Sequence, residues 1–161
     1  PECEVCHGNH KIMKPTDDML GVGKDGVCLR CHDSASAGFK TASLIKDSID
    51  DLKREITQAK ELILKSERLG VEVEDALFDI DEADNSLTKA RAYIHSFSAK
   101  EVNLVADEGK SLARKAKEFV QKSIDNFNYR RKWYIFVILI IFVFSSALYA
   151  RIKILERTNR R

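Results

Sequence analysis

Two copies of one short pattern, a cysteine pair followed directly by a histidine, lie near the start of this 161-residue chain. They are CEVCH over residues 3–7 and CLRCH over residues 28–32, and together they contain all four cysteines of the chain. In the Cys-x-x-Cys-His pattern of c-type haem attachment, two thiols bond to one porphyrin and the histidine takes one axial position of its iron. The pattern predicts two haem c groups. The predicted attachment residues are Cys3, Cys6, Cys28 and Cys31, and the predicted proximal iron ligands are His7 and His32.

Two other interpretations of the four cysteines have to be weighed. Two Cys-x-x-Cys pairs at this separation are close to zinc-ribbon spacing, and four thiolates would make a closed tetrahedral zinc site. Two disulfides are the other alternative. Neither explains why a histidine directly follows both pairs in a chain that has only four histidines. The sequence therefore favours haem.

The two remaining histidines are candidates for the distal axial positions. His10 lies three residues after His7, and residues three apart share one face of a helix, so the two cannot bind one iron from opposite sides. We expect His10 to bind the neighbouring haem, most simply the one attached at the second pattern; a surface histidine is the alternative.

His95 is the fourth histidine, and a lone histidine beside an apolar stripe usually has a structural role. However, two haems with two axial positions each require four ligands, which equals the number of histidines in the chain. A helical hairpin that turns at Gly70 would also return position 95 to the end that carries the haems. We therefore predict that His95 completes bis-histidine ligation of the first haem.

Residues 3–32 resemble the doubled-CXXCH multihaem c-type cytochromes. The likeness rests on CEVCHGNH from Cys3, on MLG at residues 19–21 and on VCLRCH from Val27. It implies electron transfer by covalently held haems. The region beyond is similar to the helical, membrane-anchored carboxyl end of some of these cytochromes.

Residues 1–38 are predicted to form a small, loop-rich di-haem domain. They have little aliphatic content, and residues 8–27 are rich in turn formers, so this segment cannot bury a core unaided. The two haems would supply the missing apolar volume. Since the chain begins at Pro1, two residues before the first haem cysteine, we expect the natural chain to be longer, with room for further haem motifs.

Residues 39–132 are predicted to form a long antiparallel three-helix bundle or coiled-coil stalk. Gly70 is expected to end the first helix, and Ser98, which begins the capping-box sequence SAKE, is expected to begin the third. Apolar residues recur along each helix at helical or heptad spacing. The first stripe is Ile45, Ile49, Leu52, Ile56, Ala59 and Ile63. The second is Val73, Leu77, Ile80, Leu87 and Ile94. The third is Val102, Val105, Leu112, Ala116 and Phe119.

Residues 133–150 are eighteen consecutive uncharged, mostly apolar residues. As a helix they would span about 27 Å, enough for the hydrocarbon core of a bilayer. Trp133, Tyr134 and Tyr149 at the two ends are typical of an aromatic belt; a buried helix of a soluble core is the alternative. Because both flanks are basic, charge hardly decides the orientation. Haem c attachment belongs outside the cytoplasm, which predicts a single-pass protein of the cell membrane with its haem domain on the periplasmic side and residues 151–161 as a basic cytoplasmic tail.

Taken together, these features predict a chain that is mostly α and carries electrons rather than catalysing a reaction. The expected partners are other redox subunits or cytochromes, with a quinol-linked complex as one candidate, and the membrane itself. The net charge of +2 gives no reason to expect nucleic acid. A structural tether or assembly subunit is the main alternative. A haem reductase is less favoured, since it needs an open axial position and four histidine ligands leave none.

Overall fold

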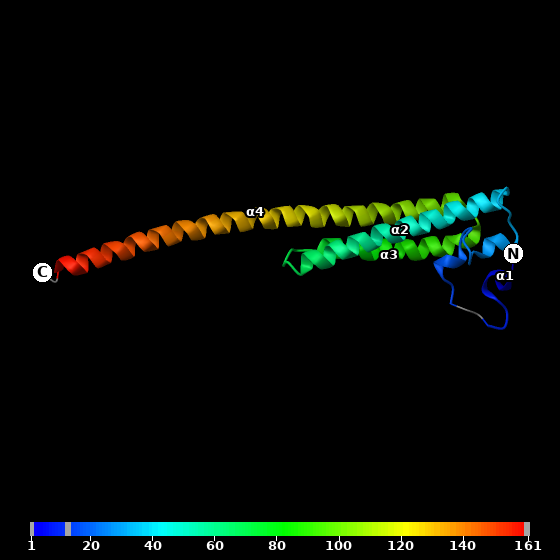
Figure 1. Ribbon diagram of the computed structural model, residues 1–161. Helices are drawn as coiled ribbons and strands as arrows, with labels where there is room; N and C mark the ends of the chain where they lie inside the picture. Colours follow the sequence, from blue (N-terminus) through cyan, green and yellow to red (C-terminus); the bar gives the residue numbers. More distant parts are fainter. Residues whose placement is uncertain (1, 12–13, 160–161) are drawn as a thin grey trace. The chain divides into compact units, whose positions relative to one another are not determined.

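The computed structural model describes residues 2–11 and 14–159, and 81% of these residues are helical, with no strand among them. The chain divides into two compact units at Val120. Figure 1 shows the order of the elements along the chain. The α-helices are α1 (Cys3–His7), α2 (Ala37–Glu67), α3 (Glu74–Tyr93) and α4 (Ala99–Asn159), and the 3₁₀-helices are η1 (Asp17–Met19), η2 (Val27–Arg30) and η3 (Ile94–Ser96).

Helix α2 supplies most of the buried isoleucine and leucine side chains of the core in the first unit. Its N-terminus is capped by Ser36, whose hydroxyl oxygen accepts a hydrogen bond from the backbone nitrogen of Phe39 at 3.1 Å. All six residues of the predicted stripe are buried: Ile45, Ile49, Leu52, Ile56, Ala59 and Ile63. The helix ends three residues before Gly70, whose φ of +74° lies in the left-handed region. The predicted stripe and the predicted helix stop are therefore confirmed.

The predicted stripe of α3 is partly wrong. Leu77 is 43% exposed and Ile94 is only half-buried. Val73, Ile80 and Leu87 are buried as predicted, and the small residues Ala76, Ala83 and Ala90 are buried between and beside them. Three alanines at seven-residue spacing thus form part of the seam, and alanine contributes little to a pattern judged by hydrophobicity.

The stripe of α4 differs from the prediction in the same way. Val105, Leu112 and Phe119 are only half-buried, although Val102 and Ala116 are buried as expected. The other buried residues of this stretch are Ala106, Gly109, Ala113 and Val120. Small side chains on two of the three helices allow their backbones to approach closely, and the large side chains of α2 fill the space between them.

Gly109 marks a point of close approach between all three helices. A Cβ atom at this position would lie 2.9 Å from a terminal methyl of Leu52 on α2 and 2.9 Å from the Cβ of Ser86 on α3. A glycine in the middle of a helix weakens it, so α4 could be expected to bend at Gly109. Helix α4 instead continues through it without interruption, and the residue is fully enclosed by the bundle.

Ion pairs and the N-terminal cap hold α4 in this bundle. Lys115 of α4 donates to the buried carboxylate of Asp79 on α3 at 2.8 Å. Ser98 caps α4 as predicted, because its hydroxyl accepts from the backbone nitrogen of Glu101 at 3.4 Å. In a capping box, the side chain of Glu101 would accept a hydrogen bond from the backbone nitrogen of Ser98. Here that nitrogen donates to the hydroxyl of Ser96 instead, at 3.3 Å.

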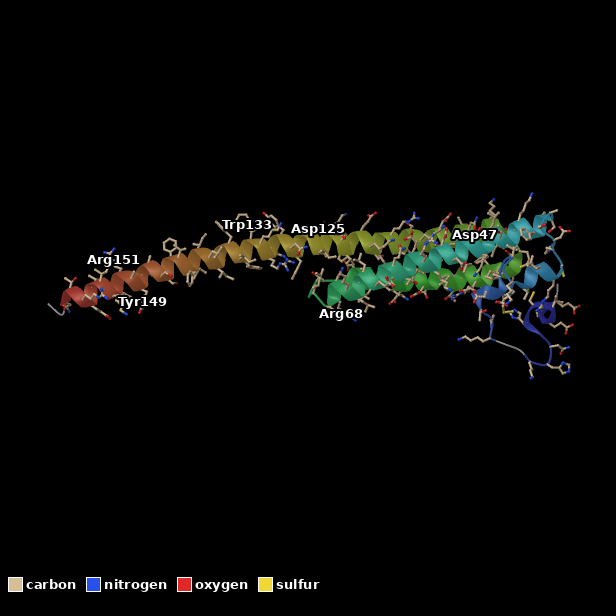
Figure 2. The ribbon with its side chains drawn as sticks, viewed as in Figure 1. Asp47, Arg68, Asp125, Trp133, Tyr149 and Arg151 are labelled. Atoms are coloured by element: carbon tan, nitrogen blue, oxygen red, sulfur yellow. The ribbon has the colours of Figure 1, made fainter. Side chains whose placement is uncertain are left out.

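The second unit consists of the later part of α4. An eighteen-residue window there has a mean hydropathy of 2.4, and none of that window is buried, so by length and composition this helix can cross a membrane. Trp133, Tyr149 and Arg151, labelled in Figure 2, lie along this part of α4. The ammonium group of Lys153 lies 3.2 Å from the hydroxyl oxygen of Tyr149. The predicted basic tail, residues 151–161, is helical as far as Asn159, and its last two residues lie outside the described part of the chain.

Candidate functional site

Each of the two cysteine patterns forms a short helical turn. The first is α1 itself, and Gly8 with a φ of +80° ends it. The second lies on η2 and the residues that follow it. In either kind of turn, residues three apart lie on the same side, so both thiols of a pair face one way. All four thiols are free; those of Cys6 and Cys28 are half-buried and those of Cys3 and Cys31 are exposed.

A hydrogen bond joins the two patterns directly. The guanidinium of Arg30, between the two cysteines of the second pattern, donates to the backbone carbonyl oxygen of Val5 at 2.8 Å. Val5 occupies the corresponding place in the first pattern. Although the two residues are 25 positions apart in sequence, the fold places the two attachment turns side by side.

The most informative contact of this region is between His7 and His95. Their ring centroids lie 6.2 Å apart, and the ring planes are inclined by 27°. Two imidazoles that each bind one iron through a single nitrogen, from opposite sides, would have centroids about 6 Å apart, because a metal–nitrogen bond of this kind is about 2 Å long. The rings are stacked, so it is their separation, and not their orientation, that fits a pair of axial ligands on one iron.

The backbone around His95 also orients its ring. His95 lies on η3, just before Phe97, whose positive φ of 56° reverses the chain between α3 and α4. The Nδ1 atom of His95 is 3.0 Å from the carbonyl oxygen of Ala92. Because a carbonyl oxygen only accepts, the neutral ring carries its proton on Nδ1 and leaves the lone pair of Nε2 free. Metal-binding histidines commonly have this arrangement.

His32 lies against the first turn of α2. A Cβ atom at Gly38 would be 2.3 Å from both Nδ1 and Cε1 of the His32 ring, so the ring needs the space that glycine leaves. The Nδ1 edge of His32 faces the helix backbone. This contact holds the ring of the second pattern without using Nε2.

His10 is exposed, and the structure pairs it with no other histidine ring within residues 2–11 and 14–159. The fold therefore brings together His7 and His95, and it leaves the predicted distal role of His10 as a prediction. No group of three or more histidine, cysteine or acidic side chains placed to hold a metal ion occurs in the described part of the chain. What the fold assembles there is a pair of imidazoles.

One residue of this region was not found from the sequence: Asp17. Its carboxylate accepts two hydrogen bonds from Arg91, one from Nε at 2.9 Å and one from Nη2 at 2.7 Å, and a third from Lys53 at 2.9 Å. The hydrogen bond from Arg91 is the main cause that lowers the pKa of Asp17 from 3.8 to about 2; burial opposes this shift and Lys53 adds to it. Nothing in the local sequence distinguishes Asp17 from neighbouring Asp18, because its partners come from α2 and α3.

Two glycines complete the attachment of this segment to the bundle. Gly21, with a φ of +81°, lies against Lys46 of α2, where a Cβ atom would be 2.7 Å from the Cβ of the lysine. A Cβ atom at Gly26 would be 2.4 Å from the carbonyl oxygen of Gly21. These glycines are the buried residues among the described positions before Ala42, which agrees with the expectation that the segment has no apolar core of its own.

Comparison of the chain with protein-family models, with curated proteins and with solved structures finds no match. Any assignment of function therefore depends on the site itself.

The residues present fit a haem c at the first pattern. Two free thiols lie on one side of α1, His7 follows them directly, and a second imidazole with a free Nε2 lies at the separation of an opposite axial ligand. At the second pattern, Cys28, Cys31 and His32 fit attachment and proximal ligation.

Proposed function

We propose that this chain is a membrane-anchored di-haem c-type cytochrome, similar to the doubled-CXXCH multihaem proteins, which relays electrons as a subunit of a larger redox complex. The observation that carries this proposal is the pairing of His7 and His95. A zinc site or a pair of disulfides would require no second imidazole opposite the histidine of a Cys-x-x-Cys-His turn. When bound, each haem c would supply a one-electron redox couple.

The roles of the residues follow from their chemistry. Cys3 and Cys6 would hold the first porphyrin and Cys28 and Cys31 the second. His7 and His95 would ligate the first iron; His32 and His10 would ligate the second. Bis-histidine ligation favours a lower potential than methionine–histidine ligation and leaves no open axial position, which suits an electron carrier better than a reductase.

The apolar part of α4 supports a membrane location. Residues 133–150 would form a single-pass anchor, with aromatic residues at both ends of the span. Haem c chemistry favours the periplasmic side for residues 1–38. A partner redox subunit, a soluble cytochrome or a quinol-linked complex would exchange electrons with this domain.

The first test is a haem count on the full chain produced with a haem c maturation system. A pyridine haemochromogen assay should give two covalent haems per chain, and elemental analysis should give iron and no stoichiometric zinc. A chain with four-thiolate zinc and no covalent haem would exclude the proposal.

The second test addresses the histidine pair. We expect His95→Met to raise the midpoint potential of one haem and to leave the haem content at two, because attachment depends on the cysteines and not on the distal ligand. Potentiometric titration with optical detection measures both quantities, and His10→Met, which leaves the His7–His95 pair intact, should raise the midpoint of the other haem instead. Unchanged midpoints and an unchanged low-spin spectrum in His95→Met would show that His95 is structural.

A further inference from the structure

The carboxylate of Asp17 joins the segment that carries the cysteine patterns to the end of α3. The guanidinium of Arg91 donates two parallel hydrogen bonds to it, at 2.9 and 2.7 Å. A bidentate ion pair of this kind is strong and also fixes the relative orientation of the two side chains. Lys53 of α2 adds a bond of 2.9 Å, and Lys46 donates to the backbone carbonyl oxygen of Asp17 at 3.0 Å. The side chain of Asp17 is only 10% exposed. Asp17, in a segment that has no apolar core of its own, is thus bonded to both α2 and α3.

Arg91 and His95 belong to one continuous helical stretch. They are four residues apart, about one turn, where α3 passes into η3. The hydrogen bond from His95 to Ala92 ties the histidine to the same turn. Consequently, the contact between Arg91 and Asp17 links the turn that carries His95 to the N-terminal segment, ten residues after His7.

We propose that Asp17 and Arg91 are a positioning pair, which holds His95 opposite His7 and thereby maintains the distal ligation of the first haem. This inference rests on the proposed function. Neither residue needs to touch the haem. Their effect is to reduce the range of positions that the first cysteine pattern can take relative to the end of α3.

The test is Asp17→Asn in the full, haem-loaded chain solubilised in detergent. The amide keeps the shape of the carboxylate and loses its charge, which weakens the bonds from Arg91 and Lys53. We expect the covalent haem count to stay at two. The ratio of coordinated to uncoordinated His95 should fall about tenfold, the equivalent of one weakened charge-assisted hydrogen bond. The reduced variant should then bind more carbon monoxide at one haem than the wild-type protein does.

Two further variants separate positioning from a general loss of stability. Asp17→Glu keeps the charge and should restore most of the low-spin state. Arg91→Gln should reproduce the effect of Asp17→Asn, and the double variant should be no worse than either single one, because both remove the same interaction. The matched control is Asp79→Asn, which weakens the ion pair between a similarly buried carboxylate and Lys115 of α4, within the bundle.

The outcomes distinguish the inference from the proposed function. If the wild-type chain carries no covalent haem, both fail. If it carries two low-spin haems and Asp17→Asn binds no more carbon monoxide than wild type, only the positioning role fails. An equal carbon monoxide response in Asp79→Asn and Asp17→Asn would also overturn it, because loss of bundle stability alone would then suffice.

Discussion

At the scale of single residues, the candidate site depends on groups whose partners are far away in sequence. The carboxylate of Asp17 meets Arg91 across 74 positions, and the ring of His7 meets that of His95. Each contact restrains a segment that has no apolar core. In such a segment, directional polar bonds have to replace the hydrophobic packing that orders ordinary domains.

The lowered pKa of Asp17 makes its contribution to stability dependent on pH. A carboxyl group whose pKa falls from 3.8 to about 2 on folding stabilises the folded state above about pH 4, and this stabilisation is lost as the pH falls from about 4 to 2. A shift of this size corresponds to about 2 kcal/mol, and because Arg91 and Lys53 are nearly half exposed, solvent screening should reduce it to about 1 kcal/mol.

We therefore expect Asp17→Asn to unfold more easily than wild type at pH 7, and the difference between them to disappear by about pH 2. Urea unfolding followed by circular dichroism across this range measures the difference. A difference that persists undiminished at pH 2 would show that the ionised carboxylate is not its source.

At the scale of elements, the three helices of the first unit contribute side chains of different sizes to the core. Helix α2 provides most of the buried isoleucine and leucine side chains, whereas α3 and α4 contribute several alanines and Gly109 to the same core. Close approach of the backbones increases the number of favourable contacts per residue, and it makes the seam intolerant of larger side chains.

Gly109→Val tests this intolerance. The first added carbon would lie 2.9 Å from both Leu52 and Ser86, so we expect overpacking to destabilise the first unit by about 1–3 kcal/mol. Chemical denaturation measures the change in the free energy of unfolding. Glu108→Val is the control, because it places the same β-branched side chain on the exposed face of the neighbouring position. Valine has a higher helix propensity than glycine and a lower one than glutamate, so a destabilisation by Gly109→Val no larger than that by Glu108→Val would show that overpacking is not responsible.

At the scale of the whole molecule, the chain combines a unit with its own core and a unit without one. The buried apolar residues lie between Ala42 and Val120, and the apolar window of α4 has none of its residues buried. The first unit therefore needs nothing from residues 133–161 to bury its core, whereas the second has no protein surface of its own to cover its apolar side chains.

Removal of residues 133–161 should convert the protein from a membrane-bound to a soluble form. We expect the truncated chain to retain the helices of the first unit and, on the proposed function, two covalent haems and the full chain's rate of electron transfer with a soluble donor. Membrane fractionation, circular dichroism and the haem assay measure these properties, and a chain that lacks only residues 151–161 is the control that should remain in the membrane. Retention of the truncated chain by membranes, or loss of electron transfer, would favour the alternative role as a structural tether or assembly subunit.

Several features follow from the sequence alone because their physical causes are local. The stripe of α2 is visible because isoleucine and leucine recur at heptad spacing, and Gly70 and Ser98 mark helix ends because left-handed geometry and capping depend on a few adjacent residues. The apolar run of α4 is visible from composition. The Cys-x-x-Cys-His patterns predict haem in the same way, because each signature consists of five consecutive residues.

Only the tertiary structure decided which side chains meet. The sequence predicted Leu77 in the core, but Ala76 lies there, because the close approach of three helices favours a small side chain that no hydrophobicity pattern identifies. Counting histidines led to His95, yet its alignment with His7 depends on how α3 returns beside α2. Asp17 carried no signal at all, since its pKa and its partners depend on residues of two helices that are distant in sequence. Long-range pairs of this kind are set by the geometry of the folded chain.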